Sequence, residues 1–369
     1  MFITVLIFLL ILTVLVLIHE LGHFFVAKKL GIKVEEFGVG IPPRAFGIKW
    51  RETIYSINWL PIGGFVKLYG EDQAGAGKIR IKDEGLRIKD KSRAFFARPP
   101  WQKALVVISG VVMNFLLAVV IFSYLYAAAG VPVPGDRVTV GNVVASSPAM
   151  QAGLFSGDII KSVNNISITS SQQLTDFTQK HLGEKLSLII ERNGKTQSID
   201  VTPRKNYPVG QGPMGVSIGV NTVLKKYPWY QAPVVGTIEA TRTSWMIASS
   251  LGKMVFDLVT KAQAPQGVAG PVGIAQLTGQ FIQIGPFAVL SLVSLLSLNL
   301  AILNILPIPA LDGGRLFFIL IEMVTRKKVS QKYENYAHAI GMAVLLTLIA
   351  LITLHDILRI ISGQPLLPK

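Results

Sequence analysis

The chain begins with an uninterrupted apolar run that ends in two histidines and a glutamate. Residues 1–18 carry no charge, and His19-Glu20-Leu21-Gly22-His23 follows directly. A run of this length is long enough to cross the hydrocarbon core of a bilayer as a helix. Because ionisable groups are costly to place in a membrane helix, their presence there points to a functional site. We expect a retained membrane helix over 1–24, since the run lacks the basic start and the small-residue cleavage site of a signal peptide.

The spacing of the two histidines is that of a metal site. Residues four apart lie on one face of a helix, so the imidazoles of His19 and His23 can bind the same metal ion. Glu20 would then lie beside the metal, where it can act as a general base. The alternative is a chance match, in which the two histidines only cap a membrane helix at the interface.

The composition is that of a multi-spanning membrane protein. Half of the 369 residues are hydrophobic and only 15% are charged. The chain has no cysteine, which excludes disulfides, thiolate metal ligands and a cysteine nucleophile. The net charge of +15 is explained by membrane topology, so we expect no nucleic-acid partner. Four segments are expected to span the membrane, namely 1–24, 104–130, 286–311 and 337–369, the last with a C-terminal tail.

Lysine and arginine beside the spans predict the orientation of the chain. They concentrate between the first and second spans and after the third, as in cytoplasmic loops. We therefore expect 25–103 on the cytoplasmic side, together with a loop over 312–336. The N-terminus, the long region between the second and third spans, and the C-terminus are expected outside. This orientation places the histidines and Asp312 at a similar depth, near the cytoplasmic face.

The regions between the spans contain further predicted elements. Residues 34–70 hold short alternating strands and turn glycines, which favours a membrane-associated β-meander or, as the alternative, a small β-loop on the cytoplasmic surface. A charged loop is expected between this meander and the second span. Residues 131–204 read as a compact α/β domain with a hairpin at Asn193-Gly194. We expect 205–285 to hold a strand and an amphipathic helix over 229–261, which lies on the outer membrane surface or braces the domain.

A third metal ligand is expected at the end of the third span. A catalytic zinc usually has three protein ligands and an open position for water, and the histidine motif supplies only two. Asp312 is the first acidic residue after this span. Pro307 and Pro309 break the helix before it, and Gly313-Gly314 frees the backbone after it, so the carboxylate can turn inward. The alternative for Asp312 is an ordinary loop at the exit from a membrane helix.

Together the two motifs resemble the site-2 protease family of intramembrane zinc metalloproteases, peptidase family M50, and in particular its bacterial RseP/RasP type. The resemblance covers nearly the whole chain, and 131–204 is similar to a single PDZ domain. Arg315 departs from the histidine that many relatives have after the double glycine. The matching segments are His19–His23, Asn304–Gly313, Gly63–Lys67, Gly110-x-x-x-Asn114-Phe115 and Ala269–Ala275.

The resemblance implies a zinc enzyme with a role for each matched residue. The implied roles are binding of Zn²⁺ for His19, His23 and Asp312, general base for Glu20, and substrate binding for Asn304, Pro307, Gly63 and Gly64. The expected fold is a polytopic α-helical membrane protein with four transmembrane helices, a membrane-associated β-meander and one extracytoplasmic PDZ-like α/β domain.

The resemblance also implies a function in a bacterial inner membrane. The expected reaction is cleavage of transmembrane segments after a first extracytoplasmic cut. An anti-sigma factor, a signal-peptide remnant and a sporulation pro-protein all fit as substrates. The expected partners are these membrane proteins and the lipid bilayer, while a peptide contact through the PDZ-like domain is left open.

Two other classes of protein compete with this interpretation. A non-catalytic, PDZ-bearing membrane scaffold would use the metal site only structurally, and Glu20 would then be dispensable. A transporter is disfavoured because the chain shows no inverted repeats. The remaining histidines, His181, His338 and His355, have no partner in a motif and are expected at the surface or the membrane interface.

Overall fold

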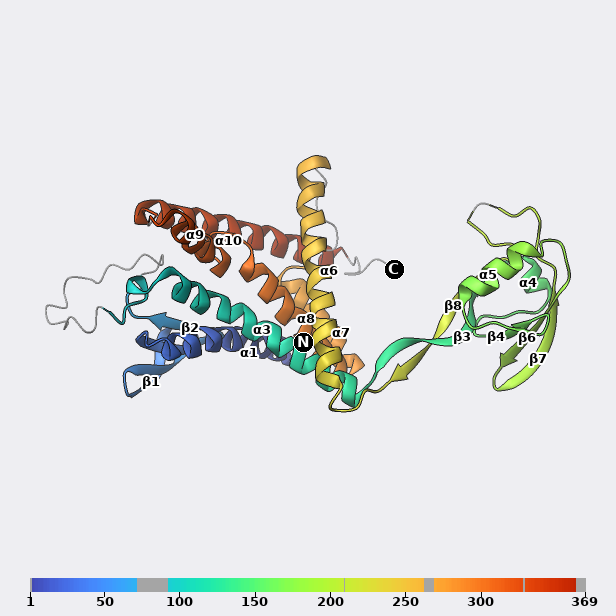
Figure 1. The fold of residues 1–369 in the computed structure, drawn as a ribbon, viewed down its shortest axis with the longest axis horizontal. Coiled ribbons are helices and arrows are strands. Elements are labelled where there is room, and N and C mark those ends of the chain that lie inside the picture. The colour runs from blue at the N-terminus through green and yellow to red at the C-terminus, as the bar shows by residue number, and fades with distance from the viewer. Residues whose placement is uncertain (1, 72–91, 209, 262–268, 328, 363–369) are drawn as a thin grey trace. The chain divides into compact units, whose positions relative to one another are not determined.

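The computed structural model describes residues 2–71, 92–208, 210–261, 269–327 and 329–362. The chain forms two compact units, shown in Figure 1. Residues 1–128 and 228–369 make a helical unit, and 129–227 make a smaller unit inserted between its two parts.

Four helices in the described residues are long and apolar enough to cross a membrane, which confirms the predicted number of spans. They are α1 (Phe2–Lys29), α3 (Pro100–Ala128), α8 (Pro286–Ile305) and α10 (Gln331–Ile361). Helices α1, α3 and α10 extend beyond the apolar segments that predicted them. Lys28 and Lys29 extend α1, because basic residues are favourable in the last turn of a helix. Proline can open α3 because the first helical residue has no backbone hydrogen bond to lose.

Helices α1, α3 and α8 pack side by side, and small residues bring their backbones together. A β-carbon at Gly22 of α1 would lie 2.3 Å from the carbonyl oxygen of Ser109 of α3, so only glycine allows this approach. On the other side of α3, Ser297 Oγ of α8 donates a hydrogen bond of 2.8 Å to the backbone oxygen of Asn114. These contacts fix α3 between the two other helices.

The segment after the third span begins as a helix, so the prediction of a loop over 312–336 is wrong for its first part. Helix α9 (Asp312–Thr325) buries Leu316 and Ile319 against Val106 and Val107 of α3. Their spacing of three places both side chains on one helical face. The double glycine lies in the first turn of α9, where it allows a close approach to the preceding loop rather than ending the helix.

The predicted β-meander is present and consists of two long, bent strands. Strand β1 (Val34–Trp50) pairs with β2 (Thr53–Leu68), and Glu36 pairs with both Ile54 and Lys67. The 34–39 part of β1 therefore lies between two parts of β2, and 44–50 forms one outer edge. Several large apolar side chains are exposed on the meander, including Trp59 at 72%. Exposure on this scale needs a lipid or protein surface to cover it. A short 3-10 helix, η1 (Phe95–Ala97), leads from this region to α3.

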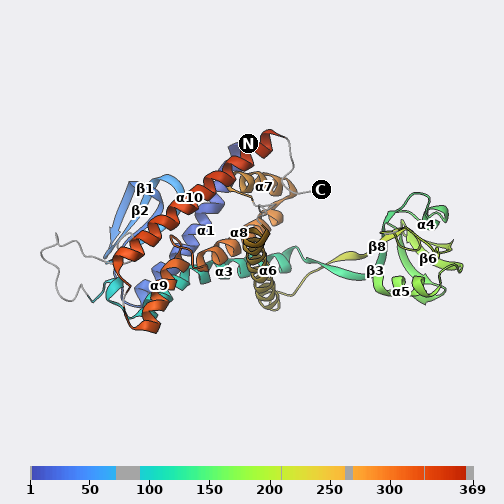
Figure 2. The ribbon, with the colours of Figure 1, turned by 90° about the horizontal axis from the view of Figure 1, so that it is seen from above.

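Two further helices complete this unit. Helix α6 (Ala232–Lys261) matches the predicted amphipathic helix, and its Ala240 is buried with residues of α3 and α8. It thus packs on the spanning helices themselves, since Gly236 allows close contact with α3. Helix α7 (Pro271–Ile284) has its first amides bound by the buried carboxylate of Asp356 from α10. Figure 2 shows α7 at one end of α10 and α9 near the other.

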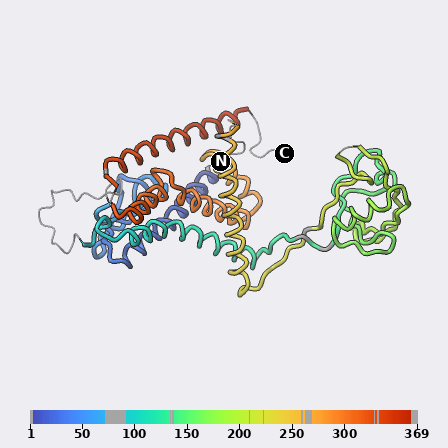
Figure 3. The backbone as a smooth tube through the Cα atoms, turned by 45° about the horizontal axis from the view of Figure 1, so that its top comes forward, coloured from blue at the N-terminus to red at the C-terminus, as the bar shows by residue number. Residues whose placement is uncertain are grey.

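The smaller unit is a sheet with two short helices, visible as the green part of the trace in Figure 3. The strand order is β7-β6-β4-β3-β8, with β5 paired to β4. Because β8 pairs with β3, the unit extends to Tyr227, past the predicted boundary at 204. Its core includes Leu154, Ile160 and Leu188. The elements are β3 (Val131–Val143), α4 (Pro148–Gln151), β4 (Ile159–Val163), β5 (Ile166–Ser167), α5 (Ser171–Lys180), β6 (Leu186–Arg192), β7 (Lys195–Val201) and β8 (Val216–Lys225).

Candidate metal centre

The side chains of His19, His23 and Asp312 converge at one point. Asp312 Oδ2 lies 2.8 Å from His19 Nε2 and 3.1 Å from His23 Nε2. The two imidazole nitrogens are 3.1 Å apart. The histidines are one turn apart on α1, and Asp312 opens α9, 293 positions after His19 in the chain. The structure therefore brings together the three residues that the two motifs singled out.

This triangle of donor atoms fits a zinc ion. Two ligands of a tetrahedral zinc with bonds of about 2.0–2.1 Å lie about 3.3 Å apart, close to the separations found here. Two imidazole nitrogens and one carboxylate oxygen are also a donor set of zinc peptidases, and they leave one position open. Glu20 belongs to the same cluster, since its carboxylate and the two histidines have potential ligand atoms within 4.8 Å of one another.

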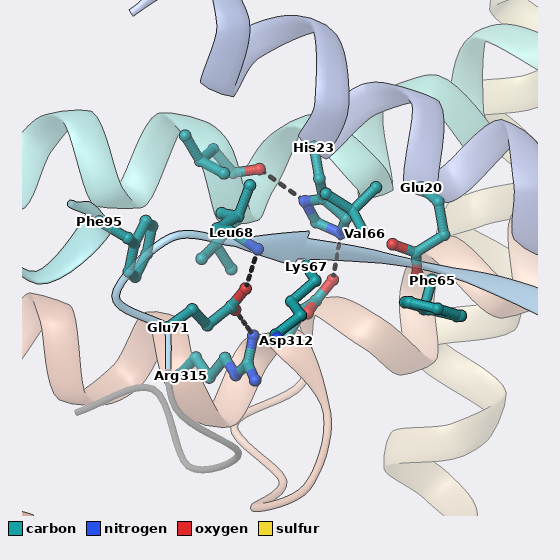
Figure 4. A pocket seen from close by; sticks show the side chains of 12 residues that line it. Glu20, His23, Phe65, Val66, Lys67, Leu68, Glu71, Phe95, Asp312 and Arg315 are labelled. Atoms are coloured by element: carbon teal, nitrogen blue, oxygen red, sulfur yellow. Dashed lines mark hydrogen bonds and ion pairs between the residues drawn. The ribbon is translucent and has the colours of Figure 1, made fainter. Parts of the chain in front are cut away.

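Two cavities meet at Glu20 and Asp312. The larger, of about 380 Å³, also has His23, Arg315 and the end of β2 in its wall (Figure 4). The smaller, of about 190 Å³, is lined by polar and apolar residues of α1 and α8 and by the loop before α9. The carboxylates of Glu20 and Asp312 are therefore accessible from both cavities.

An ion pair between Glu71 and Arg315 forms part of the wall of the larger cavity (Figure 4). Glu71 also accepts a hydrogen bond of 3.3 Å from the backbone N–H of Leu68, at the end of β2. The nearby carboxylate of Glu71 raises the pKa of Arg315 above its usual value. The pair joins the meander to α9, three residues after Asp312. The sequence indicated no role for either residue, because their separation of 244 positions leaves no pattern that links them.

The residues predicted to bind substrate lie in different places. Asn304 lines the smaller cavity, and its Nδ2 is 3.4 Å from His19 Nε2. Pro307 is exposed in the break between α8 and α9 and is absent from the walls of both cavities. Gly63 and Gly64 pack against α1, where a β-carbon at Gly64 would lie 2.8 Å from the side chain of Leu17. The two glycines thus hold β2 close to the helix that carries the histidines.

His338 contacts the loop before Asp312, although the sequence suggested a surface or interfacial residue. The backbone N–H of Ala310 donates a hydrogen bond of 3.0 Å to His338 Nδ1. Ala310 has a φ of 81°, a conformation that residues other than glycine rarely adopt. His338 therefore supports a strained turn from α10. His355 is exposed, and His181 bonds to the Phe177 carbonyl oxygen in the smaller unit.

Comparisons with known proteins agree on one family. A family model described as peptidase family M50 matches residues 7–348. The zinc metalloprotease RasP of Oceanobacillus iheyensis is 32% identical, over 97% of this chain and 99% of the relative. A putative zinc metalloprotease of Clostridium acetobutylicum is 34% identical, over 93% of this chain and 94% of the relative. Among solved structures, the PDZ domain of an SdrC-like protein from Listeria monocytogenes is 25% identical and covers 24% of this chain and 93% of its own, with a TM-score of 0.21.

Removing one imidazole from the triangle should release the metal. We expect His23→Ala to lower bound zinc from about one ion per chain to background, because the two donors that remain hold zinc weakly. Metal analysis of the purified protein measures this. His355→Ala removes an exposed histidine and is the matched control, which should keep its zinc. Equal zinc contents in the two variants would contradict the ligand set.

Proposed function

Because the chain belongs to peptidase family M50 and is a zinc metalloprotease of that family, we propose that it cleaves peptide bonds within the membrane. In this proposal His19, His23 and Asp312 bind the zinc and Glu20 is the general base. The observation that carries it is the convergence of these four side chains at the meeting point of two cavities, on helices that can span a bilayer.

Each group at the proposed metal site has a separate role in peptide hydrolysis. Bound zinc supplies a water molecule of lowered pKa and a Lewis acid for the scissile carbonyl group. Glu20 accepts the proton as water attacks the carbonyl carbon, and it returns this proton to the amine that leaves. Asn304 offers its amide to the substrate backbone in the smaller cavity.

The proposed orientation puts the metal near the cytoplasmic face of a bacterial inner membrane. Lys28 and Lys29 end α1 only one to two turns after His23. Such basic residues mark the cytoplasmic side of a span, so the 129–227 unit between α3 and α6 would lie outside.

Glu20→Gln tests the catalytic role directly. This variant should keep its zinc and lose cleavage of a model transmembrane substrate by at least about 10²-fold, as expected for loss of a general base. Cleavage products and zinc content are measured on the same purified protein. Asn304→Ala should also keep zinc, with slower cleavage. Normal cleavage by Glu20→Gln would show that Glu20 is not the general base. If the unchanged protein binds zinc and does not cleave, the alternative of a membrane scaffold with a structural metal is favoured.

A helical substrate must unwind before its peptide bonds can be attacked. Segment 64–68 of β2 pairs with 34–39 on one side, and its residues face the larger cavity together with Glu20 and Asp312 (Figure 4). An extended peptide can add to such an edge, where strand hydrogen bonds replace those of the helix. Lipid offers the unwound backbone no such partners. We propose that this edge receives the scissile segment.

Proline on this edge should weaken substrate binding and leave zinc in place. Successive strand amides point to opposite sides, so either Phe65→Pro or Val66→Pro removes the N–H that faces the cavity. We expect kcat/KM of that variant to fall by up to about fivefold, since one hydrogen bond contributes about 1 kcal/mol. Ile48→Pro, on the opposite edge of the meander, is the control. Normal cleavage by both edge variants would rule out strand addition here.

The 129–227 unit is the proposed filter for substrate size. It would admit substrates only after a first cut has shortened their outer part, as is fitting for an anti-sigma factor or a signal-peptide remnant. A protein in which a short linker replaces 129–227 should cleave an uncut substrate that the full chain leaves intact. It must also bind zinc and cleave a pre-shortened substrate, which controls for folding. A continued need for the first cut would count against the filter.

A further inference from the structure

Helix α3 presents three groups to the metal centre at intervals of four residues, which places them on one helical face. The carbonyl oxygen of Val106 lies 2.7 Å from His23 Nδ1. Gly110 comes next, where a β-carbon would lie 2.6 Å from His23 Nε2 and 2.7 Å from His19 Nε2. Asn114 follows, fully buried, with its amide nitrogen 3.3 Å from His19 Nδ1. This face of α3 therefore lies against the imidazole rings of both histidines of α1.

The proposed ligand set requires a particular proton position on each histidine. A neutral imidazole that binds a metal through Nε2 carries its proton on Nδ1. That N–H needs an acceptor, which fixes the tautomer and the ring orientation. The Val106 carbonyl oxygen is this acceptor for His23. For His19 the group within reach of Nδ1 is the amide of Asn114.

The Asn114 amide can supply the acceptor that His19 needs. The two ends of an amide have nearly the same shape, so hydrogen-bond chemistry decides which end faces a neighbour. A half-turn places Oδ1 toward His19 Nδ1. In the described part of the chain Oδ1 has no hydrogen-bond partner, so no such bond opposes the turn. The backbone of Asn114 stays fixed throughout, because Ser297 Oγ donates to its carbonyl oxygen.

We propose that Asn114 is a positioning residue of the zinc site. Its amide oxygen accepts the Nδ1 proton of His19 and so holds Nε2 ready to bind the metal. This proposal rests on the ligand set of the proposed function. The competing explanation is that Asn114 only fills space between α1, α3 and α8. An apolar side chain would fill that space without the cost of burying an amide.

Three substitutions separate positioning from packing. Asn114→Leu keeps a similar volume and removes the acceptor, whereas Asn114→Asp keeps an acceptor. Ser297→Ala removes a buried hydrogen bond at the same helix contact and leaves the Asn114 side chain in place. Zinc affinity is measured by competition with a chelator in the purified full-length protein, so the result does not depend on activity.

We expect Asn114→Leu to bind zinc 10- to 100-fold more weakly, as for other residues that orient metal ligands. Asn114→Asp and Ser297→Ala should bind zinc about as tightly as the unchanged protein. Unchanged affinity in Asn114→Leu would overturn the proposal. So would an equal loss in Ser297→Ala, which would show a packing effect, or in Asn114→Asp, which keeps both the shape and the acceptor. If Asn114→Leu does not fold, Asn114→Ala takes its place.

A failure of the ligand set can be told apart from a failure of this proposal. His19→Ala and His23→Ala should both lose zinc under the same conditions. If they retain it at full affinity, the metal site itself is wrong. If they lose it while Asn114→Leu does not, only the positioning role of Asn114 is rejected.

Discussion

Two imidazoles and a carboxylate crowd together between apolar helices, and the rest of the helical unit is arranged around that contact. Polar groups in such surroundings are stable only when each has a partner, and a metal ion can serve all three at once. The histidines lie on α1, and the carboxylate lies at the start of α9. Gly22 and Gly110 let α1 and α3 approach closely enough for α3 to contact both rings. Small residues here thus decide whether the polar cluster can form.

The same cluster explains why the site has two approaches. The proposed hydrolysis inside a membrane would need both a peptide bond and a water molecule at one carboxylate. Glu20 lines both the larger cavity, beside the end of β2, and the smaller one, beside α8 and the loop before α9. The edge of β2 forms one wall of the larger cavity, and the strained turn at Ala310 forms part of the smaller one. Both walls are supported by contacts from distant elements, namely Arg315 with Glu71, and His338 with Ala310.

Local patterns predicted the membrane-spanning helices well and singled out side chains that the structure brings together, but they failed where packing decides. Four apolar runs predicted four helices, because length and hydrophobicity alone determine whether a helix can span. The histidine spacing predicted one shared helical face. By contrast, a loop was expected over 312–336, and the structure has a helix there that buries Leu316 and Ile319 on α3. The boundary at 204 came too early because β8 joins its sheet from far along the chain.

The sequence by itself determined which residues are the candidates for the chemistry, since the spacing of His19, Glu20 and His23 is a property of any helix and Asp312 follows a break that prolines impose. It could not show what surrounds them. The contact of Asn114 with His19, and of Glu71 with Arg315, joins residues 95 and 244 positions apart. No local periodicity encodes such pairs. They arise only when glycines allow helices to pack closely and the bent meander brings its edge to the metal, which are outcomes of tertiary structure.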